Sequence, residues 1–387
     1  MAFDFYFPTR LLFGAGALQK LHEQQLPGKK ALIVTTGGQS VKKYGYLEKL
    51  QKQLGLAGVQ YELFDKVLPN PIMEHVMEGA ALAKGSGCDF VIGLGGGSSI
   101  DSAKAIAVMA TNEGSYWDYI SGGTGKGLPV PNNPLPIVAV TTTAGTGTEA
   151  DPWTVVTNGT EKIGFGYEKT FPVLSVVDPE LMISVPPHLT AYQGFDALFH
   201  STEGYLNRTA NEISDLYAEK AISLLGENLS QAVADGQDLR VRGNVALANT
   251  FAGIVEFTSG CTSEHSIEHA MSAYHPKLPH GAGLIMISLA YYSFIAKSGA
   301  CDDRMIKMAK LLGKKDAGEP MDFIRALADL QRVCGVDRLK MSDYQIAKEE
   351  LAGIAQNARK TMGGLFEVDP CEINDAAVLK ILEDSYR

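Results

Sequence analysis

The chain has 387 residues, of which 45% are hydrophobic and 20% are charged, with a net charge of −10. This composition excludes a disordered or fibrous protein, the acidic balance argues against a nucleic-acid-binding surface, and the length favours two domains. No apolar run is long enough to cross a bilayer, and the N-terminus lacks the basic segment of a signal peptide. Five separated cysteines without a CxxC motif favour a reducing compartment. We therefore expect a cytoplasmic protein without nucleic-acid or membrane partners.

Short β-branched runs alternate with helical patterns in the first half of the chain. The predicted strands cover residues 31–36, 60–64, 89–94 and 136–143, and the predicted helices cover 41–54, 74–84 and 99–111. Strands that alternate with helices are typical of βαβ units and a parallel sheet. The first half is therefore expected to form an α/β domain.

The pattern changes after the prolines at positions 179, 186 and 187 and becomes long and helical. The predicted helices cover residues 190–205, 210–234, 240–257, 263–273, 282–296, 302–312, 321–334 and 343–357. This change predicts an all-helical second domain, so we place the two domains at residues 1–184 and 185–387.

A glycine-rich segment, GLGGGSSID at residues 93–101, joins a predicted strand to a predicted helix. Glycines at such a turn let the backbone approach a ligand closely, and the helix N-terminus offers free N–H groups to a phosphate. The alternative is a tight turn before a capped helix, with Asp101 as an acid that faces the helix dipole.

A second polar loop, TTTAGTGTE at residues 141–149, follows the predicted strand near residue 140. Its hydroxyl and backbone groups can bond to a ribose or a pyrophosphate, or they can simply cap the next element. Ligands of open α/β sheets bind beyond the carboxyl ends of the strands. Because both loops follow strands, they are candidates for sharing one ligand.

Five of the eight histidines fall between residues 200 and 280. Asp196 and His200 are four residues apart, as are His265 and His269, which puts each pair on one helix face. We expect His280 on a loop before the next helix. One carboxylate with several imidazoles suits Zn²⁺ or Fe²⁺, although any single histidine could be a polar core residue. The order HxxEH at residues 265–269 leaves a zinc protease as a rival.

These motifs together resemble the iron-dependent (group III) alcohol dehydrogenases along nearly the whole chain. The matching segments are residues 7–14, 69–71, 95–98 with Asp101, 142–147, 178–180, 194–200 and the histidines at 265, 269 and 280. The resemblance implies a Rossmann-like, dinucleotide-binding α/β domain and an all-α metal-binding domain, the fold shared with dehydroquinate synthase. It implies Fe²⁺ or Zn²⁺ held by Asp196, His200, His265 and His280.

The resemblance also implies the reaction and the other site residues. The reaction is a hydride transfer between an NAD(P) cofactor and a short-chain primary alcohol, diol or aldehyde, with the metal as Lewis acid on the substrate oxygen. His269 is expected near the nicotinamide as a catalytic proton relay, and His275 matches no family histidine. The expected cofactor-binding residues are Gly38, Ser40, Asn70, Gly96, Gly97, Ser98, Asp101, Thr142, Thr143, Thr146 and Lys162.

The turn after the first predicted strand, residues 34–43, carries no acid. An acid there would repel a 2′-phosphate, so its absence favours NADP(H) over NAD(H) and the NADPH-dependent aldehyde reductase or butanol dehydrogenase branch. Gly38, Ser40 and Lys42 or Lys43 could hold the phosphate. The alternative is a plain turn followed by a solvated helix face.

The substrate pocket is less well specified. Trp153, Phe165, Phe257 and Cys261 are candidates for a partly apolar lining. Glycerol or glycerol-phosphate dehydrogenase and a dehydroquinate synthase-like enzyme remain alternatives, as does a non-catalytic sensor of NADP and metal. The apolar segment 3–7 is expected to form a strand that pairs with a second subunit, so a homodimer is expected.

Overall fold

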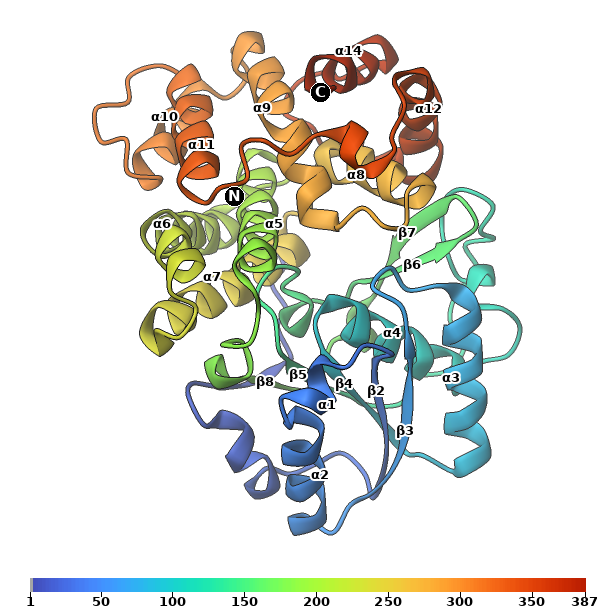
Figure 1. Cartoon of the computed structure of the whole chain (residues 1–387). Coiled ribbons are helices and arrows are strands. Elements are labelled where there is room, and N and C mark those ends of the chain that lie inside the picture. The colour runs from blue at the N-terminus through green and yellow to red at the C-terminus, as the bar shows by residue number, and fades with distance from the viewer. Residues whose placement is uncertain (1–2) are drawn as a thin grey trace. The chain divides into compact units, whose positions relative to one another are not determined.

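The computed structural model describes residues 3–387, which divide into an α/β unit and a helical unit (Figure 1). The α/β unit contains Tyr6–Asn158 and Ile163–Ser184, and the helical unit contains Val185–Arg387. Two short pieces of the first half group with the helical unit: the segment that ends at Phe5, and the hairpin tip Gly159–Lys162. The predicted boundary after residue 184 assigns both pieces to the first domain.

The α/β unit is built on a six-stranded sheet in the order β1-β8-β5-β4-β2-β3, with every neighbouring pair parallel. Its strands are β1 (Arg10–Phe13), β2 (Lys30–Thr36), β3 (Gln60–Val67), β4 (Phe90–Gly95), β5 (Ile137–Thr141) and β8 (Leu174–Val177). The central strands β4 and β5 are buried along their whole length, as expected where helices cover both faces of a parallel sheet.

Helices cover the two faces of this sheet (Figure 1). They are α1 (Ser40–Lys43), α2 (Tyr46–Leu56), α3 (Met73–Ser86) and α4 (Gly97–Met109), with the 3₁₀ helix η1 (Ala17–Glu23). Apolar residues of η1 and α2 pack on one face, and α4 packs on the other. A Cβ at Gly93 would lie 2.8 Å from the Cα of Ile100, so the glycine lets α4 lie directly on β4.

Four of the six sheet strands were predicted, and two were not. The unpredicted strands β1 and β8 have only four residues each, too few for a periodic pattern. The hairpin of β6 (Thr154–Asn158) and β7 (Glu161–Phe165) was also missed. Residues 3–7 pair with no strand among residues 3–387 of this single chain, and their pairing with a second subunit stays a prediction. The Phe5 ring lies instead 6.1 Å from that of Phe257.

The helical unit consists of helices joined by short loops, and residues 3–387 contain no helix that is long and apolar enough to span a membrane. The helices are α5 (Pro187–Leu206), α6 (Glu212–Ala234), α7 (Leu239–Thr258), α8 (Ser263–Tyr274), α9 (His280–Ser298), α10 (Asp302–Leu311), α11 (Met321–Val333), α12 (Leu351–Met362), α13 (Gly364–Glu367) and α14 (Asp375–Ser385). The predicted fold class, a parallel α/β domain followed by an all-helical one, is confirmed.

Helix α9 packs against α5, α8, α11 and α14, and thus forms the centre of the helical unit. The single helix predicted over residues 343–357 is wrong. That stretch contains the 3₁₀ helices Met341–Tyr344 and Lys348–Glu350, followed by the start of α12. Gln345 has φ 64°, a left-handed conformation that interrupts an α-helix.

Candidate functional site

Three helices of the helical unit bring the predicted metal ligands together. Helix α5 carries Asp196 and His200 one turn apart, α8 carries His265, and α9 carries His280. The structure corrects the predicted loop position of His280, which is the first residue of α9 and follows Pro279. A Cβ at Gly281 would lie 2.1 Å from the carbonyl oxygen of Tyr192, so this glycine lets α9 begin directly against α5.

The donor atoms converge on one carboxylate oxygen, Oδ1 of Asp196. The Nε2 atoms of His280 and His265 lie 3.3 Å and 3.6 Å from it, and Nδ1 of His200 lies 3.9 Å from it. Asp196, His200 and His265 are buried, and the His280 side chain is 22% exposed. The imidazoles therefore surround the carboxylate in a mostly buried place.

Two buried glutamates orient two of these histidines, and neither was predicted to have a role. Nδ1 of His265 is hydrogen-bonded to Oε1 of Glu203, and Nδ1 of His280 to Oε2 of Glu268. Histidines that ligate metals usually bond through their other nitrogen to such a carboxylate. Helix spacing could have revealed both glutamates, since Glu203 lies seven residues after Asp196 and Glu268 three after His265.

These residues fit a divalent cation. Asp196 Oδ1 and His265 Nε2 are buried and form no hydrogen bond within residues 3–387, an arrangement that costs free energy unless a bound group satisfies both atoms. One ligand atom each from Asp196, His265 and His280 lies within 4.8 Å of the others. A carboxylate with imidazoles is a donor set that accepts Fe²⁺ and Zn²⁺ alike.

The charge distribution of the cluster suits the same purpose. Burial would raise the pKa of Asp196, but the charges of His280 and His200 hold it well below its ordinary value. Burial lowers the pKa of His280, whereas the carboxylates of Glu268 and Asp196 raise it and prevail. The group at the centre is thus an ionised carboxylate, the form that binds a cation.

His269, the predicted catalytic residue, lies beside this cluster. Its ring centroid is 5.2 Å from that of His280, and its Nδ1 is 3.0 Å from Sδ of Met362. Burial, followed by the charge of Lys162, lowers the pKa of His269 well below its ordinary value. The imidazole is therefore neutral near pH 7.

Lys162 was predicted to contact the cofactor, but its ammonium group is buried within the helical unit. Nζ donates a hydrogen bond of 2.8 Å to Oγ of Ser272 and lies 3.7 Å from Oε2 of Glu268. The lysine thus compensates the charge of the glutamate that orients His280.

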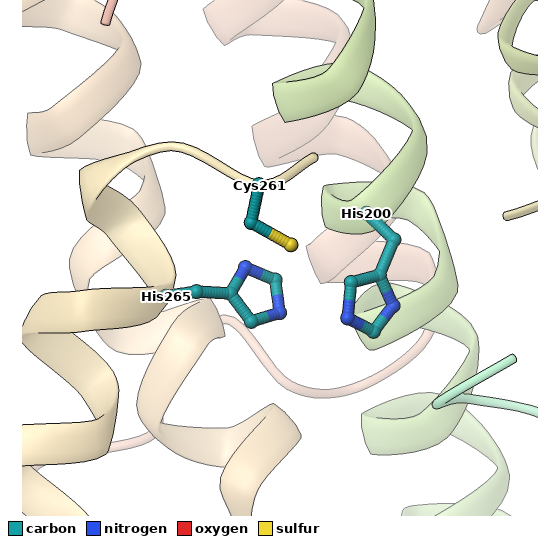
Figure 2. A group of neighbouring side chains, drawn as sticks. All are labelled: His200, Cys261 and His265. Atoms are coloured by element: carbon teal, nitrogen blue, oxygen red, sulfur yellow. The ribbon is translucent and has the colours of Figure 1, made fainter. Parts of the chain in front are cut away.

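Two further residues near the histidines have positions that the sequence did not predict. Cys261, predicted to line the substrate pocket, contributes a donor atom within 4.8 Å of donors from His200 and His265 (Figure 2). His275 does not join the Asp196 group, and its Nε2 lies 3.4 Å from Oε2 of Glu350. The structure therefore favours His280 over His275 beside Asp196.

The two predicted nucleotide loops lie side by side within the α/β unit. Neighbouring strands β4 and β5 end opposite each other, with Gly95 paired to Thr141. Helix α4 follows, with Gly96 as its N-cap. A Cβ at Gly96 would lie 2.7 Å from Oγ1 of Thr143, and one at Gly97 2.5 Å from Cγ2 of Thr146. The two glycines therefore let the loop at residues 142–146 pack against the N-terminus of α4.

Asp101 has a structural role inside the α/β unit. Its Oδ1 accepts a hydrogen bond of 2.7 Å from Oγ1 of Thr148, and its Oδ2 one of 3.0 Å from the backbone N–H of Val155. The side chain is buried. This engagement favours the structural interpretation of Asp101 over the predicted cofactor contact, because both of its oxygens already have partners.

Three of the remaining predicted cofactor residues, Gly38, Ser40 and Asn70, follow β2 or β3. Gly38 and Ser40 lie where β2 gives way to α1, and Ser98 Oγ donates a hydrogen bond to the carbonyl of Pro69, beside Asn70. The turn after β2 has an acidic neighbour that the sequence pattern did not indicate. This residue is Asp65 of β3, and its Oδ2 lies 2.5 Å from Nζ of Lys42. The ammonium of Lys42 is thus shared with a carboxylate.

The predicted pocket-lining residues do not form one group in either unit. Trp153 and Phe165 belong to the α/β unit, and Phe257 and Cys261 to the helical unit. The Phe165 ring lies 5.9 Å from that of Tyr116, edge to face. Aromatic packing within each unit therefore accounts for Phe165 and Phe257.

Comparison with known proteins covers nearly the whole chain. A family model described as iron-containing alcohol dehydrogenase matches residues 8–179, and the C-terminal model of the Fe-containing alcohol dehydrogenase family matches residues 190–386. The chain is 36% identical over 398 residues to 1,3-propanediol dehydrogenase of Klebsiella pneumoniae, covering 99% of each chain. It is 36% identical over 321 residues to NAD-dependent methanol dehydrogenase of Bacillus methanolicus, covering 81% of each.

Solved structures agree with the sequence comparisons. An archaeal halo-thermophilic alcohol dehydrogenase from a Red Sea brine pool superposes with a TM-score of 0.93 at 33% identity, covering 100% of this chain and 99% of the other. The NADH-dependent butanol dehydrogenase A from Thermotoga maritima gives a TM-score of 0.89 at 27% identity, with the same coverage. Both the α/β and the helical halves are thus shared with these enzymes.

Proposed function

Because the chain belongs to the iron-containing alcohol dehydrogenase family, we propose that it acts on short-chain primary alcohols or diols and the matching aldehydes. The chain is an oxidoreductase that interconverts alcohols and aldehydes, and the family implies a metal ion and a nicotinamide cofactor. Relatives named for propanediol, methanol and butanol support a small substrate. The synthase, protease and sensor alternatives are not favoured.

The observation that carries the proposal is the buried carboxylate of Asp196 with three imidazoles around it. In the proposal, Asp196, His200, His265 and His280 hold Fe²⁺ or Zn²⁺, and Glu203 and Glu268 orient two of the rings. The ion supplies Lewis-acid polarisation of the substrate oxygen when bound. The protein side chains fix the coordination geometry and exclude water from three of the four ligands, which are buried.

His269 is the proposed proton relay. A neutral imidazole can accept a proton and pass it on, and the pKa of His269 lies well below its ordinary value because of burial and the charge of Lys162. Its position beside His280 supports a relay close to the metal ligands.

NADP(H) is the proposed preferred cofactor. The backbone at Gly38, the hydroxyl of Ser40 and the ammonium of Lys43 would hold the 2′-phosphate, while Asn70 and the paired loops at 96–98 and 142–146 would hold the rest of the dinucleotide. Two relatives are named for NAD or NADH, so the preference rests on this chain's own turn. Asp101 and Lys162 are omitted because the carboxylate and the ammonium are engaged within their own units.

The proposed assembly is a homodimer in which the apolar segment 3–7 pairs with a second subunit. The edge strand β1 is a candidate partner, because it pairs on only one side, with β8, within the described sheet. An exposed strand edge is a ready site for pairing with a second chain. Light scattering behind size exclusion tests it: a mass of one chain contradicts the dimer.

The enzymatic proposal is tested with protein purified without oxygen and reloaded with Fe²⁺ or Zn²⁺. We expect NADPH to be consumed with butanal, at a higher kcat/KM than NADH. We expect His265→Ala to lose both metal and turnover, while the exposed control His188→Ala keeps both. Preference for NADH contradicts the cofactor assignment, and tight NADPH binding without turnover of any aldehyde contradicts the enzymatic assignment.

A further inference from the structure

Cys261 lies in a short, well-anchored turn between α7 and α8. Gly260 has φ +81°, which lets the chain reverse there. Asn207 Nδ2 donates hydrogen bonds to the carbonyl oxygens of Gly260 and Cys261, at 3.3 Å and 3.1 Å. The next residue, Thr262, donates its backbone N–H to Oε2 of Glu203 at 2.8 Å. The position of Cys261 is therefore fixed by the same glutamate that orients His265.

The thiol of Cys261 points at two histidines from different helices. Figure 2 shows Sγ directed at the space between the rings of His200 and His265, which stack with centroids 4.4 Å apart. One donor atom from each of the three residues lies within 4.8 Å of the other two. All three residues are buried, and His265 Nε2 has no hydrogen-bond partner within residues 3–387.

We infer that His200, Cys261 and His265 form a second metal position, one that takes a borderline-soft divalent ion such as Zn²⁺. Thiolates and imidazoles are both zinc ligands, and three protein ligands leave a fourth position open. The thiol loses its proton to solvent as the sulfur–metal bond forms, because the thiolate is the ligand.

This inference rests on the metal site proposed above, because both ligand sets include His200 and His265. An ion bound by Cys261 and these two histidines competes with one bound through Asp196 and His280, so each chain holds one ion. Soft ligands select zinc more strongly than carboxylates do. Cys261 therefore gives the cluster a preference for zinc. A set of one carboxylate and three imidazoles has no such preference.

X-ray absorption spectroscopy of the whole protein tests the inference. Metal-free protein receives one equivalent of Zn²⁺ without oxygen, and the spectrum is fitted for a sulfur ligand at about 2.3 Å. We expect that ligand in the wild type, its loss in Cys261→Ser and Cys261→Ala, and its retention in Cys334→Ser, which removes a buried thiol at the C-cap of α11. A zinc shell of nitrogen and oxygen alone in the wild type overturns the inference.

Metal content and turnover measured on the same samples separate this inference from the proposed function. Zinc bound through nitrogen and oxygen only, with full aldehyde turnover, leaves the proposed function standing and removes the role of Cys261. Absence of bound metal and of turnover in the wild type contradicts both. If the sulfur signal survives in both Cys261 variants, another cysteine supplies it, and the inference is also overturned.

Discussion

Nδ1 of His280 is hydrogen-bonded to Oε2 of Glu268, while Nε2 of the same ring lies 3.3 Å from Oδ1 of Asp196. The glutamate thereby fixes which nitrogen faces the proposed metal. Glu203 does the same for His265. Two residues that contact no metal in the proposed site thus determine how its ligands are presented.

Neutralising either glutamate should weaken metal binding. We expect Glu268→Gln and Glu203→Gln each to lower Fe²⁺ affinity by about 10- to 100-fold, because an orienting carboxylate also makes its histidine a better donor. Competition with a chelator measures the affinity. The control is Glu227→Gln on the exposed side of α6, and equal affinities in all three variants would contradict the orienting role.

Removing the metal should destabilise the protein. An ion that binds only the folded state adds about 2.7 kcal/mol to the free energy of unfolding at a concentration 100 times its Kd. We expect Zn²⁺ to raise the melting temperature of chelator-treated wild type and to leave His265→Ala unchanged. Scanning calorimetry measures both, and an equal rise in the variant would place the stabilising ion elsewhere.

Asp65 should limit the preference for NADPH. Its carboxylate pairs with Lys42 beside the proposed phosphate site, and the side-chain hydrogen bond from Lys42 holds the pKa of Asp65 below its ordinary value, so it is charged. We expect Asp65→Asn to raise the ratio of kcat/KM for NADPH over NADH by roughly twofold to fivefold, since exposed charge pairs contribute about 1 kcal/mol or less. Glu113→Gln, which removes an exposed acid paired with Lys84, should leave the ratio unchanged.

The sequence could predict the parts of the fold that carry a long, clean pattern. The buried strands β2, β4 and β5 read as continuous apolar runs, and the long helices of the second half repeat every three to four residues. Strands β1 and β8 were not predicted because four residues are too few to show an alternating pattern. The interruption at Gln345 was not predicted because a left-handed glutamine has no sequence signature. Elements of only a few residues depend on tertiary contacts, which a single sequence does not display.

The site was predictable where its residues share one helix, and not where helices or strands meet. Asp196 and His200 follow from their spacing, and His280 from its place after Pro279. The roles of Cys261 and Asp65 depend on contacts with other elements. Cys261 lies near His200 and His265, and Asp65 pairs with Lys42. Residues 34–43 contain no acid, but Asp65 of the neighbouring strand lies beside Lys42 in the folded chain.

Gly97 should resist substitution, in contrast to a glycine with open space around it. A Cβ at Gly97 would lie 2.5 Å from Cγ2 of Thr146, whereas nothing lies within 4 Å of one at Gly55 in α2. We expect Gly97→Ala to lower the free energy of unfolding by about 1–3 kcal/mol through overpacking, and Gly55→Ala to raise it by about 0.5–1 kcal/mol. Denaturant unfolding measures both, and a neutral Gly97→Ala would show that the threonine loop yields freely.

Asp101 should make stability depend on pH in an unusual direction for an acid. Burial, opposed by the charge of Lys104, raises the pKa of Asp101 to about 6 from 3.8. A raised pKa means that the folded state favours the protonated form, so its stabilising contribution is present below about pH 4 and is lost as the pH rises to about 6. We expect the stability of wild type relative to Asp101→Asn to fall on the order of 1–3 kcal/mol between pH 4 and pH 7. Urea unfolding at both pH values measures this difference.

Asp322→Asn is the control for Asp101→Asn. Hydrogen bonds from the backbone and from Arg325 lower the pKa of Asp322 to about 2, so this carboxylate stays ionised from pH 4 to pH 7. A rising or constant difference for Asp101→Asn would contradict the burial argument.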